Sequence, residues 1–167
     1  MYPFSSLGTL KMIYFAYFHT RIQYGIIFWG NSSESKKVFL AQKEVIRIMT
    51  GSGRRASCKS LFQELGILTI PSQYILSLTE FLLQNKEMFT SNIEIHSINT
   101  RNNLKLHKPI SNLPIYQRGV YNTCIRIFNK LPNHIANLVG SKRTFISTLR
   151  EYLVDKSLYS VEEFFNE

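Results

Sequence analysis

The number and placement of the lysine and arginine residues in this sequence indicate that the protein binds anions. Residues 95–150 hold nine Lys/Arg and no acidic residue, whereas residues 1–94 hold ten Lys/Arg with six Glu, and residues 151–167 hold one Lys with five acidic residues. This acid-free run of 56 residues predicts a surface that faces a polyanion, most commonly a nucleic-acid backbone. The alternative is a solvated basic surface that keeps the protein soluble.

A first group of basic residues is expected on a helix and the loop that follows it. The spacings of seven and four between its first three members place them on one face of a helix, opposite the core, where they would meet successive phosphates. The glycine-containing sequence GSGRR (51–55) would let the next arginines follow a strand. The alternative is an ordinary solvated helix face, which Glu44 favours. This basic ridge consists of Lys36, Lys43, Arg47, Arg54, Arg55 and Lys59.

A second group lies where the helical periodicity fails, in a long polar loop. Asparagine and arginine can contact base edges or sugars as well as phosphates, and a histidine ring can stack on a base. The alternative is a solvent loop held by Asx-type turns. The members of this loop cluster are Asn99, Arg101, Lys105, His107 and Lys108, with Thr100 and Asn102 between them.

Residues for catalysis are missing from the sequence. Polynucleotide synthesis by two metal ions needs clustered carboxylates, and the chain has a single aspartate, Asp155, and no Asp-Asp pair. We expect Glu162 and Glu163, the adjacent acidic pair, to stabilise the first turn of a helix. The four histidines lack metal-ligand spacing, and Cys58 and Cys124 suit reduced thiols. No catalytic residue, metal, cofactor or small-molecule substrate is therefore predicted.

The periodicity predicts a mainly α fold with one long basic loop. We expect a largely buried helix over 6–28, a helix over 34–49 that Ser33 caps and Gly51 ends, and helices over 57–65, 71–89, 119–129 and 141–153. Ser160 and Glu163 match a capping box for a last helix. The expected regions are a helical one at 1–90, the long basic loop at 91–118 and a second helical one at 119–167. The expected core residues of the second helix are Val38, Ala41, Val45, Ile48 and Met49.

Aromatic residues recur at helical spacing near the start of the chain. We expect them to pack in the core, with base stacking as the alternative; they are Tyr14, Tyr17, Tyr24, Phe28 and Trp29. The apolar window 12–30 is interrupted by His19, Arg21 and Gln23, which disfavours a membrane span. The first residues lack the features of a secretory signal, so an intracellular protein, nuclear or cytoplasmic and not secreted, is expected.

Several segments of the sequence resemble one family, and they occur in the same order as in that family. The phrase AYFHTRIQYGIIFWGNSSESKKVFLAQKEVIRIMTG (16–51) resembles the stretch after the polymerase core in reverse transcriptases of jockey-like non-LTR retrotransposons. The same register continues in HSINTRNNLKLHKP (96–109), FNKLPNHI (128–135) and LREYLVDKSLYSVEEFF (149–165). The resemblance extends from about Leu7 to Phe165. The aspartate motif of the family's palm is missing from this sequence.

The resemblance implies a part of a polymerase rather than a whole one. It implies a thumb and post-thumb region that holds template–primer RNA or DNA through the phosphate backbone, with the fingers and palm of the parent enzyme as protein partner. The sequence is then expected to have no polymerase activity on its own. The alternative is a domesticated helical module that binds another protein and has no nucleic-acid function.

Overall fold

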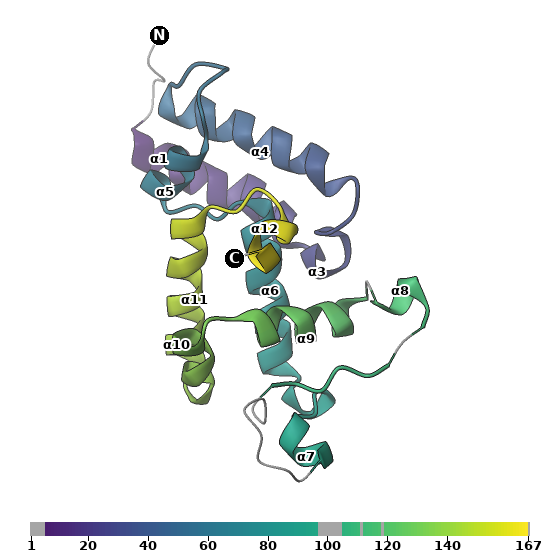
Figure 1. Cartoon of the computed structure of the whole chain (residues 1–167). Coiled ribbons are helices and arrows are strands. Elements are labelled where there is room, and N and C mark those ends of the chain that lie inside the picture. The colour runs from purple at the N-terminus through teal and green to yellow at the C-terminus, as the bar shows by residue number, and fades with distance from the viewer. Residues whose placement is uncertain (1–5, 97–104, 111, 118, 167) are drawn as a thin grey trace. The chain divides into compact units, whose positions relative to one another are not determined.

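The chain folds into helices, as the periodicity predicts. The computed structural model describes residues 6–96, 105–110, 112–117 and 119–166, with only the backbone described at 93, 96, 114 and 115. Within these ranges there is no strand, and one antiparallel bridge joins Ser91 to Leu106. The chain divides into two compact units, one of Met1–Tyr74 with Arg150–Glu167 and the other of Ile75–Leu149. Figure 1 labels helices of both.

The first unit is built mainly from the N-terminal helices and the end of the chain. Its helices are α1 (Leu7–Ile13), a π-helical turn η1 (Tyr14–His19), α2 (Thr20–Gln23), α3 (Ile26–Trp29), α4 (Ser35–Thr50), α5 (Lys59–Leu65) and α12 (Val161–Asn166). The chain passes between the units within two helices, α6 (Ile70–Gln84) and α11 (Lys142–Lys156).

The expected continuous helix over 6–28 is interrupted twice. After α1 the backbone widens into the π-helical turn, and after α2 it breaks at Tyr24, whose ψ is 111°, and Gly25, whose φ is +62°. A positive φ of this kind is strained for residues with a side chain, so glycine permits the break. The indole Nε1 of Trp29, at the end of α3, donates to the carbonyl oxygen of Tyr24 (3.0 Å). This hydrogen bond links α3 to the residue at which the helix is interrupted.

The expected burial of this first segment is wrong. Of its residues only Tyr14, Ile22 and Ile26 are buried, whereas Met12 and Tyr24 are 67% and 87% exposed. The α1 helix packs against α4 on one side, and its other apolar side chains find no cover within the described part of the chain. Apolar residues on every side of a helix therefore do not require burial on every side.

The predicted bounds of α4 are nearly right, but its cap and its core stripe are not. Ser33 does not cap the helix; Glu34 precedes it and its side chain makes no capping hydrogen bond. Gly51 ends the helix as expected, with φ +66° and its N–H bonded to carbonyls of the last turn. The buried row is Phe39, Gln42, Ile46 and Met49, so Val38, Ala41, Val45 and Ile48 are not the core positions.

Three local predictions for helix ends in the first unit are confirmed. The α5 helix ends at Gly66, which has φ +63°, and Pro71 lies in the first turn of α6. Ser160 caps the helix as predicted, since its Oγ accepts from the Glu163 N–H (3.2 Å). The Glu163 carboxylate reaches back as in a capping box, but it accepts from the Tyr159 N–H (2.9 Å), one residue before the N-cap. These bonds fix the segment 159–163 before α12.

The second unit contains the end of α6 and the helices that follow it. These are a 3₁₀ turn η2 (Lys86–Met88), α7 (Asn92–His96), α8 (Pro114–Gln117), α9 (Val120–Lys130), α10 (Asn133–Ala136), a 3₁₀ turn η3 (Asn137–Gly140) and the start of α11. The expected loop over 91–118 therefore contains two short helices. The predicted α9 is confirmed, with Cys124 and Ile127 buried and Leu131 packed beyond its end.

Helix length and hydropathy bear on whether the chain could cross a bilayer. No single helix among the described residues is long and apolar enough to do so. The pair formed by α5 and α6 suffices by length and composition together, but the two helices are bent by 50° at their junction.

Candidate nucleic-acid interface

The basic ridge is only partly available to a ligand. Lys36 is exposed on the first turn of α4, and Arg54, Arg55 and Lys59 are exposed on the loop after α4 and at the start of α5. Lys43 and Arg47 are half-buried. Four of the six predicted side chains therefore remain open to solvent.

Lys43 is engaged by aromatic rings. Its ammonium nitrogen lies 4.5 Å from the centroid of the Phe39 ring and 4.9 Å from that of Tyr159. The two rings meet edge to face, with centroids 5.3 Å apart. A cation over aromatic faces is stabilised by the ring quadrupole, which competes with an external phosphate for the same charge.

Arg47 fixes the loop that carries the next two arginines. Its Nε donates to the carbonyl oxygen of Ala56 (3.1 Å), and its own carbonyl oxygen accepts from the Ser52 N–H (3.0 Å). These contacts tie both ends of the 51–56 loop to α4. Arg54 and Arg55 are thereby presented from a loop with fixed ends, and Arg47 has a structural role in that presentation.

The ridge does not lie opposite the core, although its spacing predicts that position. Lys43 and Arg47 each follow a buried position of α4, Gln42 and Ile46, and so border the buried row. The opposite side of α4 carries exposed residues of mixed character, including Leu40 and Ile48. The predicted position of the charged row is wrong because Gln42, a polar residue, belongs to the core.

The loop cluster is described only in part. Asn99 and Arg101 lie outside the described residues, while Lys105 and Lys108 are exposed and His107 is half-buried. The backbone between them is held from both sides. Leu106 exchanges two hydrogen bonds of 2.8 Å with the Asn129 side chain, the Asn92 N–H donates to the Lys105 oxygen (2.9 Å), and the His107 N–H donates to the Thr90 oxygen (2.8 Å). Residues 105–107 thus form an anchored segment.

The expected packing of the N-terminal aromatics is partly wrong. Tyr14 is buried and Trp29 half-buried, but Tyr17, Tyr24 and Phe28 are exposed, at 69%, 87% and 78%. Burial of these three side chains would need a partner or a further segment against this face. Met12, at 67%, is exposed as well.

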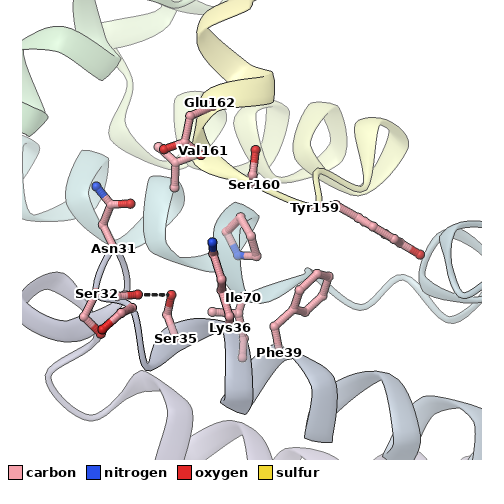
Figure 2. A pocket seen from close by; sticks show the side chains of 13 residues that line it. Asn31, Ser32, Ser35, Lys36, Phe39, Ile70, Tyr159, Ser160, Val161 and Glu162 are labelled. Carbon is pink, nitrogen blue, oxygen red and sulfur yellow. Dashed lines mark hydrogen bonds between the residues drawn. The ribbon is translucent and has the colours of Figure 1, made fainter.

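The fold also forms a cavity of about 340 Å³ beside Lys36 that no sequence pattern indicates (Figure 2). It lies between the 30–33 turn, the first turns of α4 and α6, and the 159–162 segment. No spacing rule joins segments about 120 residues apart, so only the fold brings them together. The lining residues are Gly30, Asn31, Ser32, Ser33, Ser35, Lys36, Phe39, Ile70, Pro71, Tyr159, Ser160, Val161 and Glu162.

Groups for metal binding are not assembled in the described part of the chain. No cluster of three or more His, Cys, Asp or Glu that could hold a metal ion occurs there. The Cys58 thiol is buried and its Sγ lies 3.7 Å from the Lys43 carbonyl oxygen. The pKa of His19 is lowered, first by burial and then by the positive charge of Arg150.

Comparisons with known proteins found no match. No family model, no curated protein and no solved structure matches this chain.

Proposed function

We propose that this chain is a non-catalytic, nucleic-acid-holding part of a non-LTR retrotransposon reverse transcriptase. On this proposal it binds template–primer RNA or DNA through the phosphate backbone, while the palm of the parent enzyme performs RNA-directed DNA synthesis inside the cell. The observation that carries the proposal is the group of exposed cations in the first unit: Lys36, Arg54, Arg55 and Lys59.

These cations are not neutralised within the described residues. The ion pair found near them joins Lys37 to Glu34 (2.7 Å), and no ion pair of the described residues involves Arg54, Arg55 or Lys59. Displacement of condensed counterions by such side chains provides the sequence-independent part of nucleic-acid binding. Arginine also matches the two oxygens of a phosphate with its paired N–H groups.

The order of phrases in the sequence supports the choice of family. The Gly30-Asn31 turn and the Gly51 end of α4 fall within the longest of these phrases, 16–51. In the resembling enzymes this stretch follows the palm. The proposed protein partner is therefore the fingers and palm part of the parent enzyme.

A second candidate is a helical module that binds a protein and no nucleic acid. The exposed apolar side chains Met12, Tyr17, Tyr24 and Phe28 favour it, since exposed apolar patches mark interaction sites when they are contiguous. Binding by such a module would depend little on salt. Binding to nucleic acid would weaken steeply as salt rises.

The test is the salt dependence of binding to a short primed template. We expect the logarithm of the binding constant to fall linearly with the logarithm of salt concentration. The triple variant Arg54→Glu, Arg55→Glu, Lys59→Glu should reduce that slope by about three, roughly one for each phosphate that is no longer neutralised. The matched control reverses three exposed cations of the second unit, Lys130, Lys142 and Arg143.

The two variants change the net charge equally. The control cations lie in the acid-free run 95–150, so an equal decrease of affinity in both would show either that only overall charge matters or that this run binds as strongly, and the assigned interface would be wrong. Wild-type protein with no measurable salt-dependent binding would favour the protein-interaction module.

A further inference from the structure

The cavity beside α4 contains an exposed lysine whose charge is not matched by a neighbouring ion pair of the described residues. Figure 2 shows Lys36 rising from α4 toward the segment that carries Ser160 and Val161. The adjacent Lys37, also exposed, is paired with Glu34 and does not line the cavity. Two neighbouring residues of the same charge therefore differ in whether they face the cavity.

Hydroxyl groups surround the same space. The Ser35 hydroxyl donates to the carbonyl oxygen of Ser32 (2.7 Å), as the dashed line in Figure 2 marks. The Ser160 oxygen accepts from the Glu163 N–H (3.2 Å), and a serine hydroxyl that accepts one bond still has a proton to donate. The side chains of Asn31 and Ser33 are exposed at the rim.

The walls of the cavity are apolar, in contrast to the hydroxyl groups and the lysine described above. Phe39, Ile70, Pro71 and Val161 are buried and give the cavity an apolar surface. Glu162 is exposed at the rim and places a carboxylate acceptor there. The start of α4, a helix of 16 residues, adds the partial positive charge of a helix N-terminus near Lys36.

We propose that this cavity binds a nucleoside phosphate, with the phosphate on Lys36, the apolar face of the base against the Phe39–Pro71 wall and a sugar hydroxyl or base amino group donating to Glu162. The inference rests on the proposed function and deepens it, because a strand whose terminal phosphate enters the cavity would be held by its end as well as along its backbone. A volume of about 340 Å³ suits one small ligand and is at the low end of ligand pockets, roughly 300–1,000 Å³.

The combination of groups selects this class of ligand. Inorganic phosphate alone would leave the apolar wall without a contact. An apolar ligand would leave the ammonium of Lys36 unused. A nucleoside phosphate presents an anion, donors and a flat apolar face together.

The experiment compares single-stranded RNA eight nucleotides long with a terminal phosphate, at the 5′ or the 3′ end, and the same RNA with hydroxyl ends. Free nucleoside monophosphate is a second probe, which distinguishes a strand end from a free nucleotide as the source of the ligand. Emission of Trp29 reports binding in the unmodified protein, because it is the single tryptophan and directly precedes Gly30, which lines the cavity.

For the wild-type chain we expect a terminal phosphate to strengthen binding about tenfold, the effect of one hydrogen bond to a charged group. Lys36→Gln should remove this preference, whereas Lys37→Gln, its matched control, should keep it. Glu162→Gln should lower the preference for nucleoside monophosphate over inorganic phosphate.

Each result decides between the two proposals. If phosphorylated and hydroxyl-ended RNA bind equally well to the wild-type chain, or if Lys36→Gln and Lys37→Gln change the preference equally, the cavity assignment is wrong. In that case a salt slope that still depends on Arg54, Arg55 and Lys59 would leave the proposed function standing. Absence of all RNA binding in the wild-type chain would overturn both.

Discussion

Gln42 and Tyr14 form a buried hydrogen bond of 2.8 Å, from the amide nitrogen of Gln42 to the phenol oxygen of Tyr14. The same amide nitrogen donates to the Leu68 carbonyl oxygen (2.9 Å), and its amide oxygen accepts from the Ile70 N–H (3.0 Å). One side chain thus joins the π-helical turn, α4 and the start of α6.

Replacing Gln42 by leucine should destabilise the protein by about 3 kcal/mol. The substitution keeps the volume roughly constant but leaves the hydrogen-bonding groups of Tyr14, Leu68 and Ile70 buried without their partner, and each such group costs about 1–3 kcal/mol. Urea unfolding measures the change. The control is Gln84→Leu at an exposed position of α6, which should stay within about 0.5 kcal/mol of the wild type.

Stability should fall at alkaline pH because of Tyr14. Burial raises the pKa of its phenol to about 12 from 10.0, against the smaller lowering effect of the Gln42 hydrogen bond. Between these two pKa values only the unfolded chain loses the proton, so the contribution is complete below pH 10 and is lost as pH rises toward 12. It amounts to at most about 2.7 kcal/mol.

The measurement is the free energy of unfolding of the wild type and Tyr14→Phe between pH 8 and 11.5. The pKa of the Cys124 thiol is also raised by burial to about 12, so the wild-type curve alone would mix two groups. The difference between the two proteins isolates Tyr14. Parallel curves over the whole range would contradict the prediction.

Gly30→Ala should destabilise the first unit by about 1–3 kcal/mol, the usual cost of overpacking. A β-carbon at this position would lie 2.4 Å from Cδ2 of Tyr74, whose ring is buried, and 2.7 Å from the carbonyl oxygen of Ile26. Gly53→Ala is the control, because a β-carbon there meets nothing within 4 Å. Thermal unfolding of both variants should separate them by several degrees.

The exposed apolar side chains of the N-terminal helices should cause self-association at high protein concentration. Replacing Tyr24 and Phe28 together by serine should shift the protein toward the monomer, because these are among its most exposed apolar side chains. Light scattering over a concentration series measures the change. A wild-type chain that stays monomeric at every concentration would show that this surface is harmless in solution.

Purified protein should not extend a primed template with dNTPs and Mg²⁺. Its only aspartate, Asp155, lies on α11 and is exposed, so no pair of aspartates can hold two metal ions. Incorporation of labelled nucleotide against a boiled control is the measurement. Template-dependent extension would contradict the proposed function.

Helix ends with local signals were predictable from the sequence. Gly51 and Gly66 ended their helices at positive φ, and Ser160 with Glu163 capped α12, because each of these effects acts within a few residues. The core row of α4 was missed for the opposite reason. Gln42 is buried by partners 26 to 28 residues away, and no property of its own neighbourhood shows that.

The candidate site was less predictable than the fold. The sequence indicated which residues carry charge, but the structure shows that Lys43 is engaged by Phe39 and Tyr159, whereas Lys36 stays exposed beside the cavity. Tyr159 is more than a hundred residues further along the chain than either lysine. Whether a lysine is free to bind a ligand depends on such distant contacts, so it could not be derived from the spacing of the lysines in the sequence.

Because Tyr14–His19 forms a π-helical turn, the number of residues in this segment bears on how α1 packs. A π turn holds about one residue more than the α-helical turn it replaces. Deleting one residue there, such as Ala16, would therefore leave a regular helix with α1 in nearly the same rotational position relative to α2, whereas one residue deleted from a regular α-helix rotates the preceding part by about 100°. The row of α1 side chains that faces α4 would then be kept, so the π turn is the place where this segment can lose a residue without changing which side of α1 is packed.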